Sequence, residues 1–550
     1  MKKKIISGVY LGMLLIASLI IVFEKITNIY PVLISVGVFS VLFGLTFLLS
    51  ARWLFSAVLT GTLFIIIKFL NQIKIHYYKD SLMFSDLNIM LDPANQGTLG
   101  HYWLAGLAVV AMLVWLIFNM FLSWKQAKSV RGIKWRALSL VLIAAGVWDV
   151  NMTINAYHNE WQASLPKGPG TMSNMVMSAR DAQYQPPQFG TSADYFLQQA
   201  KRVTLPEPQS AIKPDIVVLL QESTVNPNIY QLPADTLLPP LFMFQHDAEA
   251  RAQSPLRVQT FGGGTWLSEF SVLTGLSTDD FVPRKNSVFY FVVDHLPNSL
   301  FRAMKANGYY TVVLTPFNKS AYHAGYAYQK LGVDRIIQPQ ELGYPASIDD
   351  NLWQIKTEEV LSYVKTILAK ETDKPIFIYA LTMYEHGPYD ESHSDDYKLA
   401  GKLKDSSAVG KFSHYMEKLT TSDPAIKAFS EFVAKRDKPT VFLYFGDHQP
   451  SIRFREYSSS LPDPAHLTQF TLRDNLKQGA PITTTGRLTD ISFLGGMILE
   501  RARLAAPPFY QANIKMRHLC GGELDDCQDK ALVESYKHYI YQQLSVAGKQ

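Results

Sequence analysis

The segment "FGGGTWLSEF", residues 261–270, places one threonine hydroxyl directly after three glycines. We expect a helix to begin near Thr265 and to end at Gly275, because apolar residues recur at helical spacing between them: Trp266, Phe270 and Leu273. Unpaired N–H groups and the helix dipole favour an anion at a helix start, and glycines let the backbone approach a ligand closely. Thr265 is therefore a candidate nucleophile toward a phosphate ester, with a plain helix N-cap as the alternative.

Four further side chains with acid–base or metal-ligand chemistry follow apolar runs. They are Glu222 in "LLQES", His386 in "MYEHGPY", and Asp447 and His448 in "YFGDHQP". Carboxylate oxygens together with imidazole nitrogens suit a divalent cation of hard or borderline character. Coordination to such a cation would also activate the hydroxyl of Thr265. Taken singly, Asp447 is equally explained as a cap of the next segment, and His448 as a surface histidine.

These side chains require a sheet that brings the ends of separate strands together. Four short apolar runs have the pattern of buried strands: 215–220, 311–317, 375–383 and 440–446. Helical stretches such as 298–308 and 351–370 separate them. This alternation predicts an α/β domain with a mostly parallel central sheet over 213–550. Ligands of such sheets gather at the carboxyl ends of the strands, which is where the candidate metal ligands lie.

The first part of the chain has the composition of a membrane domain. Five apolar runs approach the roughly 20 residues that a helix needs to cross a bilayer: 5–23, 31–49, 53–70, 102–123 and 137–155. We therefore divide the chain into a transmembrane domain with five helices (1–156), an extracytoplasmic linker rich in proline and glycine (157–212) and a catalytic α/β domain (213–550). A cleaved signal peptide is the alternative for the first run.

Basic residues predict the orientation of these helices. Arg52 lies between the second and third runs, lysines precede the first run, and further basic residues crowd the connection before the fifth: Lys125, Lys128, Arg131, Lys134 and Arg136. Because positive charge marks the cytoplasmic side, we expect the N-terminus inside and the α/β domain outside the cytoplasm of a bacterial (inner) membrane. The formal net charge of +5 gives no reason to expect a nucleic acid partner.

Both cysteines of the chain, Cys520 and Cys527, lie in the segment "CGGELDDC" of the exported part. In an oxidising compartment, a close pair around a Gly-Gly turn is expected to form a small structural disulfide. The alternative is a metal site with His518 as a third ligand, and this site would lack a fourth ligand.

In this order, and behind five apolar runs, the motifs resemble the lipoteichoic acid synthase type of phosphoglycerol transferase, which belongs to the alkaline phosphatase and sulfatase superfamily. The resemblance covers nearly the whole chain, and "GGTWLSEFSVLTGL" is its most specific part. It implies a fold of sulfatase or alkaline phosphatase type and one divalent cation, Mn²⁺ or Mg²⁺, with Zn²⁺ as the alternative. It further implies a nucleophile, Thr265, a head-group contact, His386, and the metal ligands Glu222, Thr265, Asp447 and His448.

The resemblance also implies a reaction. Phosphoglycerol would move from a membrane phospholipid, with phosphatidylglycerol as the expected donor, to an extracytoplasmic glycan or glycolipid through a phosphothreonine. One departure concerns the head group. The family has a tryptophan and an arginine between the threonine and the histidine, whereas this chain reads "TPFNKSAYHAGYAYQKLG" without an arginine. Asn318 or Tyr322 could substitute, and Lys319 or His323 would supply the positive charge.

Other functions stay open. A phosphoethanolamine transferase shares the fold, the membrane anchor and the threonine chemistry and often uses zinc, but its members usually carry more cysteines than the two present here. A non-catalytic lipid-binding membrane protein would be expected to have lost a metal ligand or the nucleophile, and all four positions are filled. A sulfatase needs a modified cysteine or serine in its nucleophile motif, which "TWLSE" lacks.

Overall fold

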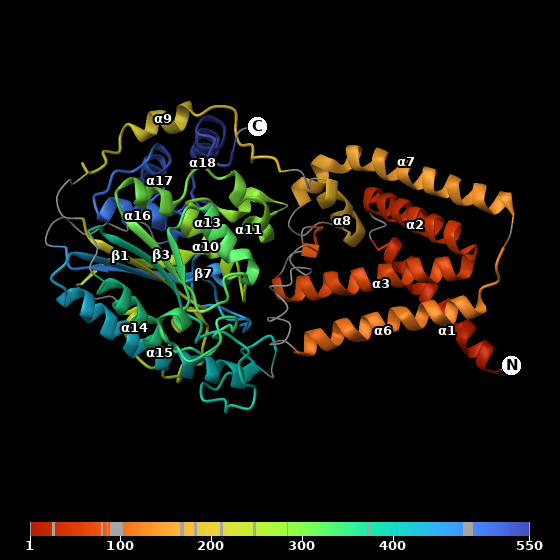
Figure 1. The fold of residues 1–550 in the computed structure, drawn as a ribbon, viewed down its shortest axis with the longest axis horizontal. Coiled ribbons are helices and arrows are strands. Elements are labelled where there is room, and N and C mark those ends of the chain that lie inside the picture. Colours follow the sequence, from red (N-terminus) through yellow and green to blue (C-terminus); the bar gives the residue numbers. More distant parts are fainter. Residues whose placement is uncertain are drawn as a thin grey trace. The chain divides into compact units, whose positions relative to one another are not determined.

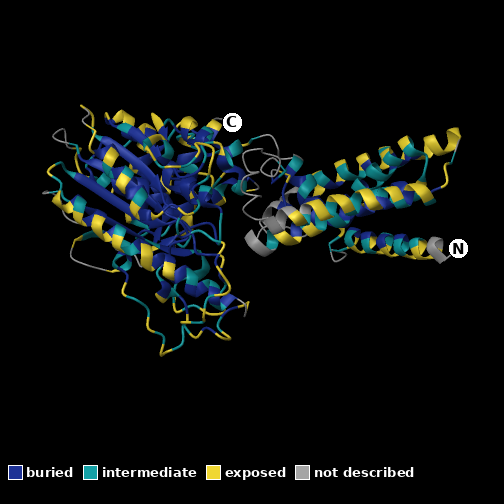
Figure 2. Cartoon of the chain, turned by 60° about the horizontal axis from the view of Figure 1, so that its bottom comes forward, coloured by how far each residue is buried: buried dark blue, intermediate teal, exposed yellow. Residues whose placement is uncertain are grey.

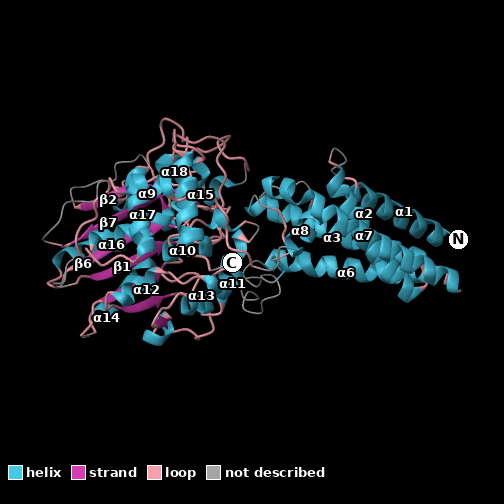
Figure 3. Cartoon of the chain, turned by 90° about the horizontal axis from the view of Figure 1, so that it is seen from above, coloured by secondary structure: helices cyan, strands magenta, loops and turns pink. Residues whose placement is uncertain are grey.

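The computed structural model describes most of the chain, and Figure 1 shows its helices and strands. The described residues are 2–24, 28–78, 81–84, 86–87, 103–130, 132–164, 170–180, 184–208, 213–245, 249–282, 284–370, 373–405, 408–476 and 488–548. The chain divides into two compact units, Met1–Tyr184 and Gln185–Gln550. All the strands of the protein that the structure describes lie in the second unit (Figure 3).

The first unit is a bundle of long apolar helices. Its elements are α1 (Lys2–Val22), α2 (Ile29–Ser50), α3 (Trp53–Tyr78), α6 (Trp103–Gln126), α7 (Ile133–Ser164) and the shorter α8 (Thr171–Arg180). Among the described residues, four of these helices are long and apolar enough to cross a membrane, and the apolar part of α6, Val110–Gln126, is shorter. Many apolar side chains on these helices are exposed, as is expected for a surface that faces lipid (Figure 2).

Helices α2 and α7 approach each other at glycine positions. A Cβ atom added to Gly146 would lie 2.6 Å from the carbonyl oxygen of Gly37, and one added to Gly44 would lie 2.7 Å from a side-chain carbon of Ile143. Small residues at such crossings let helix backbones pack closely, which is a common feature of membrane bundles.

The second unit is built on one mixed sheet. Its strands are β1 (Asp215–Gln221), β2 (Ala250–Arg257), β3 (Tyr310–Leu314), β4 (Arg335–Ile337), β5 (Ile376–Leu381), β6 (Thr440–Gly446), β7 (Leu467–Asp474) and β8 (Thr489–Asp490). Within the described residues their order is β4-β3-β5-β1-β6-β7-β2-β8. Strands β4, β3, β5, β1 and β6 are parallel, and β7 runs antiparallel to both β6 and β2. The predicted mostly parallel sheet is confirmed.

Helices cover both faces of this sheet (Figure 1). On one side lie α14 (Thr357–Leu368) and α15 (Val409–Lys435), and on the other lie α10 (Thr265–Thr274), α16 (Leu494–Arg501) and α17 (Pro508–Leu519). Shorter helices are α11 (Val288–Phe291), α12 (Leu300–Ala306) and α13 (Ala324–Lys330). Strands β1, β5 and β6 are buried along their whole length, which explains why their sequences are continuous apolar runs rather than alternating ones.

The segment 157–212, expected to be a linker, is divided between the two units. Helix α7 continues to Ser164 and α8 follows it in the first unit. In the second unit, α9 (Asp194–Ala200) packs on α18 (Lys530–His538), where the buried ring of Phe196 lies 5.2 Å from the ring of Tyr536. The proline-rich stretch before α9 therefore leads into a packed helix of the second unit.

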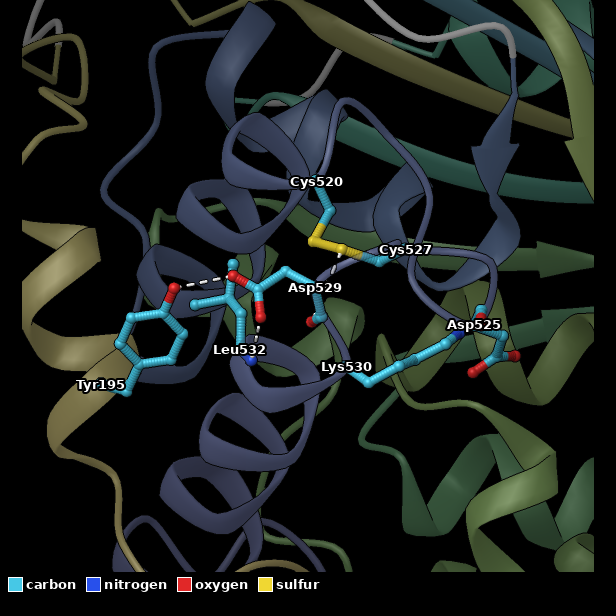
Figure 4. The surroundings of a disulfide bond; sticks show 7 residues. All are labelled: Tyr195, Cys520, Asp525, Cys527, Asp529, Lys530 and Leu532. Carbon is cyan, nitrogen blue, oxygen red and sulfur yellow. Dashed lines mark hydrogen bonds between the residues drawn. A yellow bond between two sulfur atoms is a disulfide. The ribbon is translucent and has the colours of Figure 1, made fainter.

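A disulfide joins Cys520 and Cys527, as predicted (Figure 4). The alternative metal site is wrong, because both sulfur atoms take part in this bond and the His518 ring lies 2.8 Å from Glu500. Asp529 follows the disulfide loop in the sequence. Its carboxylate accepts hydrogen bonds from the backbone N–H of Leu532 and the hydroxyl of Tyr195. The loop thereby fixes the start of α18 and ties it to α9.

Candidate active site

The pairing of β1 with β6 brings the candidate metal ligands together. Gln221 and Gly446, the last residues of these strands, are register partners, so Glu222 and Asp447 follow them side by side at the carboxyl edge of the sheet. Potential ligand atoms of Glu222, Asp447 and His448 all lie within 4.8 Å of one another, and all three residues are buried. Strand order thus produces the cluster that the sequence motifs predicted.

The distances within this cluster are those of one compact site. The His448 Nε2 atom lies 3.2 Å from Asp447 Oδ2 and 3.5 Å from Glu222 Oε1. The Thr265 hydroxyl donates a hydrogen bond of 3.0 Å to Glu222 Oε2. The candidate nucleophile is therefore in direct contact with the candidate metal ligands.

Two ligand atoms in the cluster have no hydrogen-bond partner. Asp447 Oδ1 accepts from the backbone N–H groups of Ser223 and His448, at 2.8 Å each, while Asp447 Oδ2 accepts from none. The Nδ1 atom of His448 lies 2.9 Å from the carbonyl oxygen of Gln449, which places a ring proton on Nδ1, and Nε2 has no hydrogen-bond partner. Buried polar atoms are normally paired, so two orphaned ligand atoms fit a cation. The oxygen and nitrogen donors suit a divalent metal ion.

The electrostatics of the site also favour a cation. Burial raises the pKa of Asp447 well above its usual value, and the nearby Glu222 carboxylate raises it further. Burial opposes the charge on Glu222 as well, but His448, His386 and hydrogen bonds from Ser223 and Thr265 hold the pKa of Glu222 below its usual value. A bound cation would keep both carboxylates ionised.

The three glycines before Thr265 all have left-handed backbone conformations. Their φ angles are +70° at Gly262, +147° at Gly263 and +83° at Gly264, which other residues rarely adopt. A Cβ atom on Gly262 would lie 3.1 Å from the Cα atom of Ser451. The glycines therefore permit a tight loop that ends at Thr265, the first residue of α10.

The predicted bounds of α10 are confirmed. The helix spans Thr265–Thr274, and Gly275 ends it with a φ angle of +75°. The hydroxyl of Ser268, in the first turns of α10, donates a 2.6 Å hydrogen bond to the carbonyl oxygen of Asp447. This bond fastens the start of α10 to the carboxyl end of β6.

The residues predicted to contact the head group have different surroundings. His386 lies in the loop after β5, where its ring is 4.7 Å from that of Trp353, and it contributes to lowering the pKa of Glu222. The ammonium group of Lys319 forms a 2.6 Å ion pair with Glu341. The ring of His323 stacks at 4.6 Å on Tyr290. The structure thus associates His386 with the cluster, whereas the contacts it gives Lys319 and His323 involve other groups.

Sequence reasoning missed one buried carboxylic acid beside the nucleophile. Glu269 is fully buried on α10 and accepts hydrogen bonds from the hydroxyls of Tyr322 and Tyr328. A signal for it existed, because Glu269 occurs at helical spacing among the apolar residues of α10: Trp266, Phe270 and Leu273. An acidic residue on the apolar face of a helix indicates a buried polar contact.

The sheet, its helical layers and the threonine beside a carboxylate–imidazole cluster define a member of the alkaline phosphatase and sulfatase superfamily. Residues 214–500 match the family model Sulfatase, and the chain belongs to this family. An uncharacterised protein of Haemophilus influenzae is 33% identical over 98% of this chain and 100% of its own length.

Two more distant similarities cover different parts of the chain. The lipoteichoic acid synthase-like protein YvgJ of Bacillus subtilis is 23% identical over 34% of this chain and 30% of its own length. The solved structure of the integral membrane protein lipooligosaccharide phosphoethanolamine transferase A (EptA) from Neisseria meningitidis matches 90% of this chain and 91% of its own, with a TM-score of 0.50 and 13% identity. This second likeness is one of fold, and it includes the apolar N-terminal helices.

Proposed function

We propose that the protein is a membrane-anchored phosphotransferase that moves a phosphoglycerol head group from a phospholipid to a glycan or glycolipid. The observation that carries this proposal is the Thr265 hydroxyl, which starts α10 and donates to Glu222 beside two orphaned ligand atoms. A hydroxyl in such a position can attack a phosphate, because the helix start and the cluster both stabilise charge there.

The proposed reaction has two steps, both on Thr265. The hydroxyl oxygen of Thr265 forms a bond to the phosphorus of the lipid head group, the phosphorus–oxygen bond to diacylglycerol breaks, the departing diacylglycerol oxygen takes up a proton in place of the one that Thr265 loses, and a phosphothreonine remains. An acceptor hydroxyl then attacks this ester and restores Thr265. A divalent cation held by Glu222, Asp447 and His448 would lower the pKa of a hydroxyl and neutralise charge on the phosphoryl oxygens. Backbone N–H groups at the start of α10, which begins at Thr265, would stabilise charge on the same phosphate.

The choice of head group follows from the sequence motifs. "GGTWLSEFSVLTGL" resembles the phosphoglycerol transferases, and YvgJ, a sequence relative, is named for lipoteichoic acid synthase. In this proposal His386 contacts the head group, and Lys319 or His323 supplies positive charge. Phosphoethanolamine is the second candidate, which the fold of EptA favours. The proposed metal ion is Mn²⁺ or Mg²⁺ for phosphoglycerol, with Zn²⁺ as the alternative.

The membrane helices have a direct use in this reaction. A phospholipid donor, with phosphatidylglycerol as the proposed one, lies in the bilayer, so its transferase must be held at the membrane surface. The basic loops place the second unit outside the cytoplasm in our proposal, where glycan or glycolipid acceptors expose hydroxyl groups.

Mass spectrometry of the full chain tests this proposal. The purified protein, loaded with Mn²⁺, is incubated with vesicles of phosphatidylglycerol or of phosphatidylethanolamine, and the peptide that contains Thr265 is analysed. A glycerophosphate adduct on Thr265 is the expected result. A phosphoethanolamine adduct would favour the second candidate, a phosphoethanolamine transferase. A chain without any adduct would support the alternative of a non-catalytic lipid-binding protein.

A further inference from the structure

Glu269 is a buried acid that the proposed reaction leaves without a role. It lies one helical turn after Thr265, and its side chain is fully buried. Its Oε1 atom accepts a 3.0 Å hydrogen bond from the hydroxyl of Tyr322, and its Oε2 atom accepts one from the hydroxyl of Tyr328 on α13. These bonds connect the nucleophile helix to the segment that follows β3.

The environment keeps Glu269 neutral near pH 7. Burial raises the pKa of its carboxyl group to about 8, the hydrogen bonds from the two tyrosines oppose this shift, and the negative charges of Asp447 and Glu222 add to it. A neutral acid adds no third negative charge beside the metal cluster. It can still accept hydrogen bonds from hydroxyl groups on both sides.

Tyr322 is held in an unfavourable backbone conformation. Its φ and ψ angles are 38° and 33°, and the φ angle of the next residue, His323, is 64°. Left-handed conformations are uncommon for residues other than glycine, so surrounding contacts must hold Tyr322 in place. The bond from the Tyr322 hydroxyl to Glu269 is one such contact.

Tyr322 is the second ring of an aromatic row that begins at Trp266 and ends at His386. The distances between ring centroids along the row are 5.8 Å for Trp266–Tyr322, 5.7 Å for Tyr322–Phe317, 4.9 Å for Phe317–Trp353 and 4.7 Å for Trp353–His386. One end of the row adjoins Thr265 in the sequence, and the other end, His386, acts on Glu222. The row therefore links the residue next to the nucleophile with the head-group histidine.

We propose that the aromatic row forms a wall of the site and that Glu269 is a positioning residue for it. Glu269 holds Tyr322 in place through one carboxyl oxygen, and Tyr328 binds the other oxygen. Glu269 touches neither the substrate nor the metal ligands in this role. That the wall faces a lipid head group rests on the proposed function. The anchoring of Tyr322 by Glu269 does not depend on that function.

Substitutions at Glu269 test the proposal. Glu269→Ala removes both hydrogen-bond acceptors, including the one that holds Tyr322. We expect the KM for the lipid donor in adduct formation to rise about tenfold, the factor that corresponds to the free energy of one buried hydrogen bond. Glu269→Gln retains the same shape and one carbonyl acceptor for the Tyr322 hydroxyl, and its amide group can donate to the Tyr328 oxygen, so it is expected to stay within about twofold of the wild type. Tyr322→Phe should reproduce the Glu269→Ala effect. The affinity for Mn²⁺ should not change in any of these variants.

Tyr379→Phe is the matched control. Tyr379 is a buried tyrosine of β5 close enough to influence Glu269, but its hydroxyl has no hydrogen-bond partner in the described part of the chain. Removing that hydroxyl should leave the KM for the donor and the Mn²⁺ affinity unchanged. An equal loss in Tyr379→Phe and Tyr322→Phe would indicate general damage to the core and would overturn the proposal.

Hydrogen exchange of residues 318–326 gives a second readout that needs no lipid. Backbone N–H groups in this segment bond within it, for example from Gly325 to the carbonyl oxygen of Lys319 at 2.7 Å. We expect exchange there to accelerate about tenfold in Glu269→Ala and to stay unchanged in Glu269→Gln. Unchanged exchange in Glu269→Ala, or equal acceleration in both variants, would overturn the anchoring role. If the wild type forms no adduct but the two variants differ in exchange as expected, only the proposed function is refuted.

Discussion

At the scale of single residues, the site combines two hydroxyl donors, Ser223 and Thr265, with two atoms that lack a partner. The Thr265 hydroxyl donates to Glu222, while Asp447 Oδ2 and His448 Nε2 are buried without a hydrogen bond. A purely structural N-cap would not require this cluster, because its hydroxyl would accept from a backbone N–H group. In the structure the N-cap residue of α10 is Gly264, so Thr265 occupies the first helical position and does not cap the helix.

Substitution of the nucleophile gives the first prediction. Thr265→Ala should abolish adduct formation and transfer, because it removes the attacking oxygen, whereas Thr265→Ser should retain part of the activity. The measurements are adduct mass and product formation. Thermal unfolding serves as the control, since the loss of one nearly buried methyl and hydroxyl should cost only about 1 kcal/mol. Full activity in Thr265→Ala would contradict the assignment of Thr265 as the nucleophile.

Asp447→Asn gives the second prediction. Two buried carboxylates without a cation repel each other, so in a chelator the variant should unfold at the same temperature as the wild type or a higher one. With Mn²⁺ at one hundred times its Kd, the wild type should gain about 2.7 kcal/mol and the variant much less. Thermal unfolding with and without Mn²⁺ measures both effects. Equal stabilisation of both proteins would place the metal elsewhere.

At the scale of elements, the site depends on how α10 begins. The glycine loop uses three left-handed residues to place Thr265 against the ends of β1 and β6, and the Ser268 hydroxyl fixes the helix there. The sequence signal for this arrangement is strong because each feature is local. Only glycine adopts these φ angles readily, and Gly275 ends the helix for the same reason.

Gly264→Ala tests this loop and is the third prediction. A Cβ atom there would lie 2.9 Å from the hydroxyl oxygen of Thr260 at a φ angle of +83°, so the loop must shift and Thr265 with it. We expect a loss of roughly 1–2 kcal/mol in stability and a much larger fall in transfer rate. Gly343→Ala, at a φ angle of +102° with open space around it, is the control. This variant should lose stability but keep its transfer rate. Equal activity of the two variants would contradict the prediction.

The disulfide loop belongs to a second cluster of charges. The Lys537 ammonium of α18 lies 2.6 Å from Asp280 and 3.6 Å from Asp525, which sits between the two cysteines. Burial raises the pKa of Asp490 to about 7, and the charge of Asp525 contributes to this shift. Burial likewise raises the pKa of Asp525 to about 6, although Lys537 lowers it in part.

The stability of the second unit should therefore depend on pH, which is the fourth prediction. The folded state holds protons on Asp490 and Asp525 more tightly than the unfolded chain, whose carboxyl groups titrate near pH 4. This contribution to stability is present at about pH 4 and is lost as the pH rises to about 7. Thermal unfolding across this range measures the slope. Asp490→Asn should flatten the slope, and an unchanged slope would show that other groups cause it.

At the scale of the whole molecule, the chain joins a bundle of apolar helices to a sulfatase-family domain. Each unit is compact and has its own internal contacts. The proposed donor is a membrane lipid, and in that proposal the helices would keep the domain and the donor at one surface. Tethering of this kind raises an effective concentration without any new contact at the site.

Separation of the two units gives the fifth prediction. A fragment of residues 185–550 should retain the Mn²⁺ affinity of the full chain and form the Thr265 adduct with a short-chain, water-soluble donor. On vesicles, its rate should fall about 10²- to 10⁴-fold relative to the full chain, because the tether is lost. The comparison of rates on both donors is the measurement. A fragment as active on vesicles as the full chain would show that the helices serve another purpose.

The sequence by itself determined what is local in this protein. The five apolar helices, the four central strands, the start of α10 at Thr265 and the disulfide were all predicted, because apolar runs, glycine positions and cysteine spacing act within a few residues. The same positional reasoning named Glu222, Asp447 and His448, since parallel strands present their carboxyl ends at one edge.

Only the tertiary structure decided what depends on distant partners. The structure alone gave the β5-β1-β6 order, the antiparallel β2 and β7, the contacts of Lys319 and the tyrosine partners of Glu269. Strand order and buried hydrogen bonds result from the packing of segments far apart in the chain, and no pattern within one segment encodes its partner. For this reason the sequence identified the chemical groups of the site, and the fold determined how they are held.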